Sequence, residues 1–244
     1  GDEVITVANS WISTSETITQ CGARPIFVDI DPVYYTIDES KIEEKINLNT
    51  KAIIPVHLYG QMCEMNKIVE IANKHNLIII EDCAQSHFSV FEEKYAGTFG
   101  IAGSFSFYPG KNLGAYGDAG AIITNDDELA TRCKMFARHG ALIKHQHIIE
   151  GINSRLDGLQ AAILSVKLDY IIEWTQKRID ISSYYTTLFK DLPDLIIPAV
   201  RPSTKHTFHL YVVRVKYRNA LQEYLSAKGI ETAIHYPTPL PFMQ

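Results

Sequence analysis

The chain has 244 residues, of which 46% are hydrophobic and 21% charged, and its formal net charge is −5. This composition is that of a globular protein with a substantial core. The acidic balance, without a basic stripe, argues against a general nucleic-acid binder, and we find no apolar run of the roughly 20 residues that a transmembrane helix needs. Four scattered cysteines form no C-x-x-C pair and no secretory signal opens the chain, so we expect reduced thiols and a cytoplasmic protein.

The first eighty residues alternate strand and helix patterns. We predict strands at 4–8, 25–30, 52–56 and 77–80, and helices at 13–21, 38–46 and 65–75. These strands are continuously apolar, which is typical of a parallel sheet covered on both faces by helices. Ligands bind beyond the carboxyl ends of such strands. Asp29, His57 and Asp82 each follow a strand and are therefore site candidates, although Asp29 fits the cap of a turn better.

The second half of the chain continues the pattern and then changes. We predict strands at 105–107 and 119–124, a helix at 126–138, a long helix at 156–174 with a core face of Leu159, Ala162, Ile163 and Val166, and a further helix to about 189. A strand at 209–215, a helix at 219–228 and a strand at 231–234 then indicate the beginning of a smaller α/β domain. We therefore expect a large domain at 1–172, and a linker helix with part of a small domain at 173–244.

Lys111 lies in the stretch FSFYPGKNLGAYGDAGAIITND, in a Gly-rich loop between two apolar runs. Burying an ammonium group is costly, so a lysine in this place indicates either chemistry, such as a Schiff base with a carbonyl, or a side chain that snorkels to solvent. Asp82 and Lys111 together suit pyridoxal phosphate, because a carboxylate can pair with the ring nitrogen while the amine holds the aldehyde carbon. Ser106 could then reach the phosphate, and Gln85 the edge of the ring.

Seven stretches carry a resemblance to a known family. They are GDEVITVANSWIST at the start, FVDIDP, KAIIPVHLYGQ, IIEDCAQSH, the stretch around Lys111, INSRLDGLQAAIL and IHYPTPLP. In this order they cover nearly the whole chain, which resembles the DegT/DnrJ/EryC1/StrS family of sugar aminotransferases, a branch of the fold-type I enzymes that depend on pyridoxal phosphate. The resemblance implies the mostly parallel central sheet of that α/β fold.

Carried over by position, the family's cofactor-binding residues fall on residues already named. The resemblance implies that Lys111 is the Schiff-base lysine, Asp82 the partner of the ring nitrogen, Gln85 a contact of the ring oxygen and Ser106 a phosphate ligand. Trp11 falls where the family stacks an aromatic side chain on the ring, although packing in the core would also account for a tryptophan there.

Four further residues are expected at the substrate or at a second subunit. Asn153 matches an asparagine that in the family reaches the phosphate of the neighbouring subunit, which implies a homodimer with shared active sites; from the sequence alone it would pass for a helix-entry residue. His235 and Tyr236 match a C-terminal motif near the nucleotide-sugar, and alone would pass for a strand end. Arg155 is a candidate for the substrate pyrophosphate, or it pairs with Asp157.

The resemblance implies transfer of an amino group from glutamate to a keto group, at C3 or C4, of a nucleotide-linked deoxysugar. Such sugars serve cell-surface polysaccharides, including the O-antigen of lipopolysaccharide, and antibiotics. Sugar dehydratases of the same family carry histidine in place of the lysine, so Lys111 disfavours that alternative. A regulatory or scaffold relative without activity is the other alternative. The family's Gly-Thr phosphate segment is missing before Gly1, and the chain ends in mid-pattern at PTPLPFMQ, so we expect it to be truncated at both ends.

Other cofactors are disfavoured by the sequence. His139, His145 and His147 could suggest a metal site, but no cysteine or acidic residue lies at ligand spacing, and we expect a solvated loop or one that lines the substrate entrance. Gly100 and Gly103 do not complete the G-x-G-x-x-G pattern of a dinucleotide site. We therefore expect pyridoxal phosphate as the cofactor and no metal.

Overall fold

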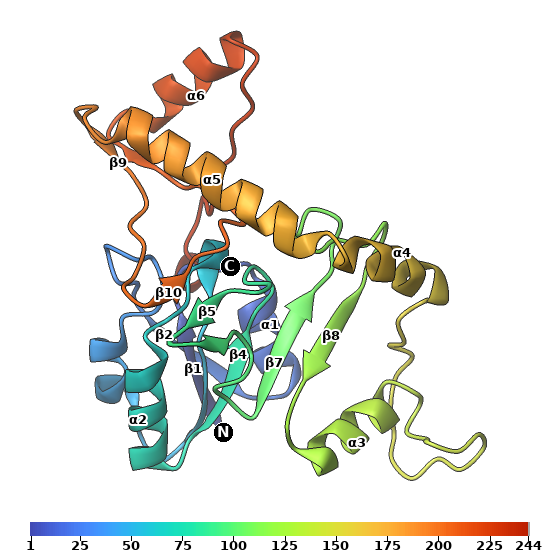
Figure 1. Cartoon of the computed structure of the whole chain (residues 1–244). Coiled ribbons are helices and arrows are strands. Elements are labelled where there is room, and N and C mark those ends of the chain that lie inside the picture. Colours follow the sequence, from blue (N-terminus) through green and yellow to red (C-terminus); the bar gives the residue numbers. More distant parts are fainter. Residues whose placement is uncertain (244) are drawn as a thin grey trace.

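The computed structural model describes residues 1–243, which form a central sheet with helices around it (Figure 1). The sheet has six strands in the order β2-β1-β3-β4-β7-β8. Their bounds are Arg24–Val28 (β2), Glu3–Val7 (β1), Thr50–Ile54 (β3), Ile78–Asp82 (β4), Ala102–Ser106 (β7) and Gly120–Ile123 (β8). Every pairing in this sheet is parallel except that of β7 with β8. The predicted mostly parallel α/β sheet is confirmed.

Six α-helices accompany the sheet within the described residues. They are α1 (Ser13–Gln20), α2 (Met65–His75), α3 (Asp127–Phe136), α4 (Gly158–Leu168), α5 (Ile171–Phe189) and α6 (Arg218–Ala227). Helix α2 has the predicted bounds: Met65, Ile68 and Ala72 are buried on one face, and Asn76 ends it in a left-handed conformation with φ 54°. None of these helices combines the length and apolar character needed to cross a membrane.

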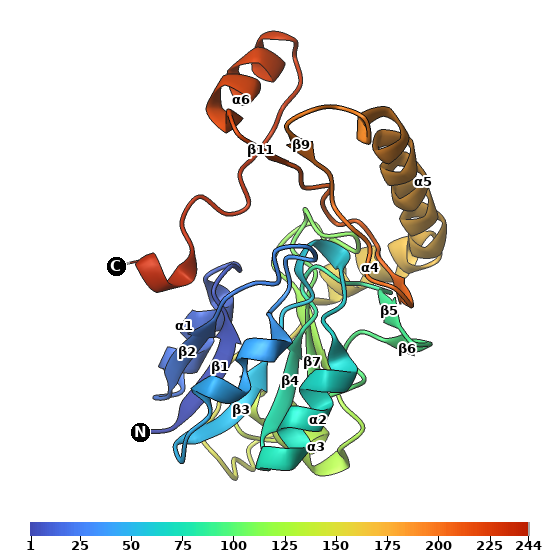
Figure 2. The same cartoon turned by 90° about the vertical axis from the view of Figure 1, so that its left-hand side faces the viewer.

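Short elements complete the structure. Two small sheets contain β10 (Thr204–Lys205) with β5 (Val90–Phe91) and β6 (Lys94–Tyr95), and β11 (Arg214–Val215) with β9 (Leu195–Ile196). The 3₁₀ turns are η1 (Glu39–Lys41), η2 (Glu43–Lys45), η3 (Leu58–Gly60) and η4 (Leu240–Phe242). In the view turned by 90° (Figure 2), α6, β9 and β11 project above the central sheet, beside the upper end of α5. The predicted boundary at 172/173 falls at the start of α5, and the division into two domains stays a prediction.

Two predicted α-helices differ from the structure: one is a pair of 3₁₀ turns, and the other is two separate helices. Residues 38–46 form two 3₁₀ turns: Lys41 N bonds Asp38 O at 3.1 Å and Lys45 N bonds Ile42 O at 3.0 Å, while the Asp38 side chain caps Ser40. The helix predicted at 156–174 is divided after Leu168. This division lets Leu164 of α4 and Ile171 of α5 enter the same apolar cluster. Leu159, Ala162 and Val166, expected in a core face, are exposed.

Of the two predicted C-terminal strands, one is shorter than expected and the other does not form. Of residues 209–215 only Arg214–Val215 is a strand, because the preceding backbone is paired elsewhere: Leu210 N donates to Tyr59 O at 3.4 Å and Arg178 donates to the carbonyl of His209. Residues 231–234 have no regular structure. The contact with the turn at 59–60 requires a glycine, since a Cβ on Gly60 would come within 2.8 Å of Thr207 Oγ1.

The loop that carries Lys111 is held in place by contacts with α4 and α5. Leu113 and Ala115 are buried in a cluster with Leu164 of α4 and Ile171 of α5. Ala115 N donates to Phe107 O at 2.7 Å, and Lys167 Nζ donates to Gly114 O at 2.6 Å. The packing of Leu113 and Ala115 thus fixes the loop on both sides of Gly114, although the loop has no regular structure of its own.

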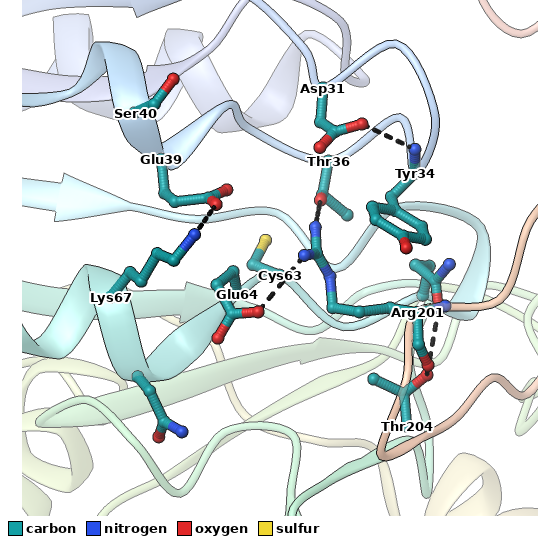
Figure 3. Close-up of polar contacts among 12 residues, drawn as sticks. Asp31, Tyr34, Thr36, Glu39, Ser40, Cys63, Glu64, Lys67, Arg201 and Thr204 are labelled. Atoms are coloured by element: carbon teal, nitrogen blue, oxygen red, sulfur yellow. Dashed lines mark hydrogen bonds and ion pairs between the residues drawn. The ribbon is translucent and has the colours of Figure 1, made fainter.

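Arg201 joins the C-terminal segment to the chain around Thr36 and Glu64 (Figure 3). Its guanidinium is buried, donates to Glu64 Oε2 at 3.3 Å and to Thr36 Oγ1 at 3.4 Å, and lies 4.2 Å from the centre of the Tyr34 ring. Thr204 closes the turn by donating to Arg201 O at 2.6 Å. This clamp directs the following residues, 206–210, toward the carboxyl edge of the sheet.

Candidate active site

A cavity of about 600 Å³ lies beyond the carboxyl ends of β4 and β7, where the parallel sheet was expected to bind a ligand. Its walls come mainly from the start of α1, the turn after β4, the Lys111 loop and the C-terminal segment. Among the lining residues are Trp11, Asp82, Gln85, Ser106, Lys111 and Tyr236. With His235, which also lines it, seven residues proposed from the sequence therefore share one cavity.

The Asp82 carboxylate ends β4 and is held at both oxygens. Thr14 of α1 donates from Oγ1 to Oδ2 over 2.7 Å, and the backbone N–H of Ala84 donates to Oδ1 over 3.1 Å. Each carboxylate oxygen has a second lone pair. Asp82 can therefore accept a further hydrogen bond from a group in the cavity.

Lys111 is half-buried in a turn in which its own N–H donates to Tyr108 O at 2.9 Å. Burial lowers the pKa of its amine, and the negative charge of Asp82 opposes that shift. The snorkelling alternative does not describe this side chain, because it is half-buried and lines the cavity. A lowered pKa increases the fraction of uncharged amine, which is the form that attacks a carbonyl.

Gln85 is fixed at both ends of its amide. Its Oε1 accepts from the backbone N–H of Tyr59 at 2.7 Å, and its Nε2 donates to the Tyr236 hydroxyl at 2.8 Å. The bond from Tyr59 settles which end of the amide is oxygen. Gln85 Nε2 keeps one hydrogen that it can donate to a ligand.

Trp11, Ser106 and His235 complete the expected set in the cavity. Trp11 is 60% exposed with its ring 6.1 Å from that of Tyr236, so the alternative that it packs in the core is wrong. Ser106, at the end of β7, accepts from Tyr108 N at 3.3 Å and has its own hydrogen free to donate. Burial lowers the pKa of His235, whose carbonyl accepts a hydrogen bond from the Tyr59 hydroxyl.

His209 is a cavity residue that the sequence analysis missed. Asn112 donates from Nδ2 to Thr207 O, so its Oδ1 faces His209 Nδ1, 3.2 Å away. That nitrogen must therefore carry the hydrogen, which leaves Nε2 as an acceptor. Burial, together with the charge of Lys111, lowers the pKa of His209 to about 3 and keeps the ring neutral. Its pattern in the sequence was that of a strand, which gave no sign of this position.

Asn153 and Arg155 lie outside this cavity. Both are exposed, and Arg155 Nε donates to Asn153 Oδ1 at 3.0 Å instead of pairing with Asp157. Arg155 lines a larger hollow of about 1260 Å³ beside β8 and α3, which also borders Ser106. Their roles at a second subunit and at a pyrophosphate stay predictions.

His57, the third candidate at a strand end, is a structural residue. It is fully buried behind the cavity with Nε2 2.9 Å from Glu81 Oε2, and its Nδ1 accepts from Cys63 N. Glu81 also accepts the backbone N–H groups of Gly97, Phe99 and Gly100. His57, Glu81 and Cys83 could geometrically surround a metal ion, but these hydrogen bonds already occupy the carboxylate.

The histidine loop at 139–147 and Asp29 have the structural surroundings of a solvated loop and of a turn cap. His147 Nδ1 lies 2.7 Å from the carbonyl of His139, on an exposed loop, and the described residues bring His139, His145 and His147 into no metal-binding cluster. Asp29 accepts from Ile30 N at 2.8 Å, as the cap of a turn does.

The profile of the DegT/DnrJ/EryC1/StrS aminotransferase family matches residues 1–244. The chain belongs to this family. Among curated members, it is 51% identical to the dTDP-3-amino-3,6-dideoxy-alpha-D-galactopyranose transaminase of Aneurinibacillus thermoaerophilus, over 98% of this chain and 66% of that protein. It is 48% identical to the pleiotropic regulatory protein of Geobacillus stearothermophilus, over 98% of this chain and 65% of that one. The chain thus spans just under two thirds of these DegT/DnrJ/EryC1/StrS relatives.

Solved structures of the family have the same fold. DesV of S. venezuelae, solved with a ketimine intermediate, matches with a TM-score of 0.97 at 38% identity, over 99% of this chain and 65% of that one. NtdA of Bacillus subtilis, solved with the cofactor PMP, matches with a TM-score of 0.92 at 36% identity, over 100% of this chain and 57% of that one. The cavity described above therefore lies in the fold of a DegT/DnrJ/EryC1/StrS aminotransferase.

Proposed function

We propose that the protein is an aminotransferase that uses pyridoxal phosphate to transfer an amino group from glutamate to a keto group of a nucleotide-linked deoxysugar. The observation that carries this proposal is the meeting of Lys111, Asp82 and Gln85 in one cavity at the carboxyl edge of the sheet. The transaminase relative and the PMP-bound structure support it.

The side chains of the cavity fit this cofactor on their own chemistry. Burial gives Lys111 a lowered pKa, and Asp82 has acceptor capacity left on a fixed carboxylate. Gln85 has one N–H left to donate to an acceptor such as a ring hydroxyl. The Ser106 hydroxyl can donate to a phosphate oxygen, and Trp11 offers an aromatic face. An amine, an anion and two neutral donors in one cavity match the aldehyde, ring nitrogen and oxygens of pyridoxal phosphate.

Pyridoxal phosphate, when bound, supplies an electron sink for the carbanion formed during amino transfer. The chain's residues would do the rest. Lys111 would hold the cofactor covalently, release it when an amino donor arrives, and move the proton at the reacting carbon. Asp82 would hold the proton on the ring nitrogen. His235 and Tyr236, at the open side of the cavity, would contact the nucleotide-sugar.

Glutamate as donor, the homodimer and the cytoplasmic location belong to this proposal. Exposed Asn153 lies outside its own cavity, which agrees with a role at the site of a second subunit. Among the exposed apolar side chains of α4 and α5 are Leu159, Val166, Leu168, Ile172 and Leu188, and an interface would cover them. Sedimentation of the full-length protein, with and without cofactor, tests the dimer.

A second candidate function is that of a regulatory protein that has this fold but no catalytic activity. One relative is named a pleiotropic regulatory protein, which is why we retain this candidate. The lysine, the aspartate and the glutamine of the cavity favour catalysis. To decide, the full-length protein is incubated with pyridoxal phosphate and then glutamate while its visible spectrum is recorded, and next with a panel of nucleotide keto-sugars, with products read by mass. An aminotransferase shows a lysine-linked absorbance that glutamate bleaches, and an aminated sugar. A protein without either change contradicts the proposal.

A further inference from the structure

Asp82 lies at the end of a chain of two buried hydroxyl groups. Thr14 Oγ1 is 2.7 Å from Asp82 Oδ2, and Ser10 Oγ is 2.9 Å from Thr14 Oγ1. Thr14 and Ser10 are only 4% and 3% exposed, and both line the cavity. Ser10 lies just before α1 and Thr14 in its first turn, so α1 brings both hydroxyls to the end of β4.

The direction of this hydrogen-bond chain follows from its ends. An ionised carboxylate only accepts, so Thr14 must donate its single hydrogen to Asp82. Thr14 then has no hydrogen left for Ser10, and Ser10 must be the donor to Thr14. The bond to Asp82 is charge-assisted, and the bond from Ser10 polarises the Thr14 hydroxyl and strengthens it further.

The two oxygens of Asp82 are thus held by different elements. Oδ2 is bound by Thr14 of α1, while Oδ1 is bound by Ala84 N in the turn after β4. Together the two bonds fix the plane of the carboxylate. Without Thr14 the carboxylate could rotate about its remaining bond, and it would stay in the cavity without a defined orientation.

We propose that Ser10 and Thr14 are positioning residues that orient the Asp82 carboxylate for the ring nitrogen of the cofactor, and so determine how firmly the proton stays on that nitrogen. This inference rests on the proposed function. It adds Ser10, which lies before α1, and Thr14, in the first turn of α1, to the site formed by the sheet and the Lys111 loop.

The test uses full-length protein loaded with pyridoxal phosphate that carries ¹⁵N in its ring, and records the ¹⁵N chemical shift and the cofactor dissociation constant. In Thr14→Val, an isosteric change, we expect the ¹⁵N signal to move toward that of a neutral pyridine, and cofactor binding to weaken about tenfold, the effect of losing one hydrogen bond to a charged group. Ser10→Ala moves both readouts in the same direction by a smaller amount. Thr14→Ser keeps the hydroxyl and restores both.

Thr17→Val is the matched control, because Thr17 lies on the same helix and its hydroxyl bonds only backbone carbonyls of α1. We expect it to match the wild type. The inference is overturned if Thr14→Val shows the wild-type ¹⁵N shift, or if Thr14→Ser is as impaired as Thr14→Val. If Thr14→Val fails to fold, Ser10→Ala and Thr14→Ser still decide. Failure of the wild-type protein to bind the cofactor would instead contradict the proposed function.

Discussion

Gln85 Nε2 donates a hydrogen bond to the Tyr236 hydroxyl over 2.8 Å, although 151 positions separate the two residues. The bond joins the turn after β4 to the C-terminal segment across the mouth of the cavity. Because Tyr59 N holds the other end of the Gln85 amide, the side chain has one orientation. In the proposed function, Tyr236 therefore supports the cofactor contact of Gln85 as well as facing the substrate.

Removal of the Tyr236 hydroxyl tests this relationship. In Tyr236→Phe we expect the cofactor dissociation constant to rise about threefold to tenfold, because the Gln85 amide loses one of the two hydrogen bonds that fix it. Titration of the cofactor-free protein, followed by absorbance, measures the change. Tyr224→Phe, on the exposed face of α6, is the control and should leave the constant unchanged. Equal constants for Tyr236→Phe and wild type would show that Gln85 needs no partner.

Asp82→Asn should keep the fold and lose most of the activity. The amide is of the same size, but it carries no charge to hold a proton on a ring nitrogen, so we expect turnover to fall by about a hundredfold or more. Steady-state kinetics measure turnover, and circular dichroism checks the fold. Asp29→Asn is the matched control, since Asp29 only caps its own turn. An Asp82→Asn variant with more than half of the wild-type turnover would exclude the assigned role.

Glu81→Gln should destabilise the protein without removing any group from the cavity. The buried Glu81 carboxylate accepts three backbone N–H groups in addition to its bond with His57, and an amide cannot accept them all. We expect a loss of about 3 kcal/mol in the free energy of unfolding, measured by urea titration. Glu43→Gln, at an exposed ion pair with Lys74, should change it little. Equal losses in the two variants would contradict a structural role for the buried pair.

Glu81 also contributes to the dependence of stability on pH. Hydrogen bonds from His57 and from the backbone N–H groups outweigh desolvation and lower the pKa of Glu81 from 4.5. A carboxyl group whose pKa is lower in the folded state stabilises it above the unfolded value. This contribution should be lost as the pH falls below 4.5 through the folded pKa.

His206 should make the stability of the protein depend on pH at higher values than Glu81 does, below about pH 6.5. Burial lowers its pKa from 6.5 to about 3, and its Nδ1 accepts from Phe208 N at 2.9 Å. Below pH 6.5 the unfolded chain binds a proton that the folded protein excludes, so stability falls as pH drops, by about 2 kcal/mol at pH 5 for this residue. His206→Asn retains an acceptor and should lose less stability than wild type between pH 7 and pH 5, whereas exposed His139→Asn should behave as wild type. Identical losses in all three would refute this account.

The sequence predicted the features that depend on local pattern and chain order. Helix α2 ends where Asn76 follows its amphipathic pattern, and the apolar strands placed Asp82 at the edge of the sheet. The motif around Lys111 then indicated the cofactor chemistry. These elements are encoded by residues close in the chain, so no knowledge of distant contacts was needed.

The features that the sequence did not predict depend on long-range contacts. His209 lies in the cavity because the backbone of residues 207–210 pairs with the turn at Tyr59 and Gly60, which overrides a strand pattern. Thr14 meets Asp82 across 68 positions, and nothing in the composition of α1 distinguishes Thr14 from Thr17. Such pairings are decided by packing between elements, which the pattern of one segment does not contain.

The central claim is that the Lys111 amine holds pyridoxal phosphate in the cavity beside Asp82. The most direct measurement is the visible spectrum of the full-length protein with added pyridoxal phosphate, compared among wild type, Lys111→Ala and exposed Lys51→Ala. We predict a lysine-linked absorbance band in wild type and in Lys51→Ala that borohydride reduction fixes to the peptide containing Lys111, and no such band in Lys111→Ala. A band of wild-type intensity in Lys111→Ala, or cofactor fixed to another lysine, would contradict the account.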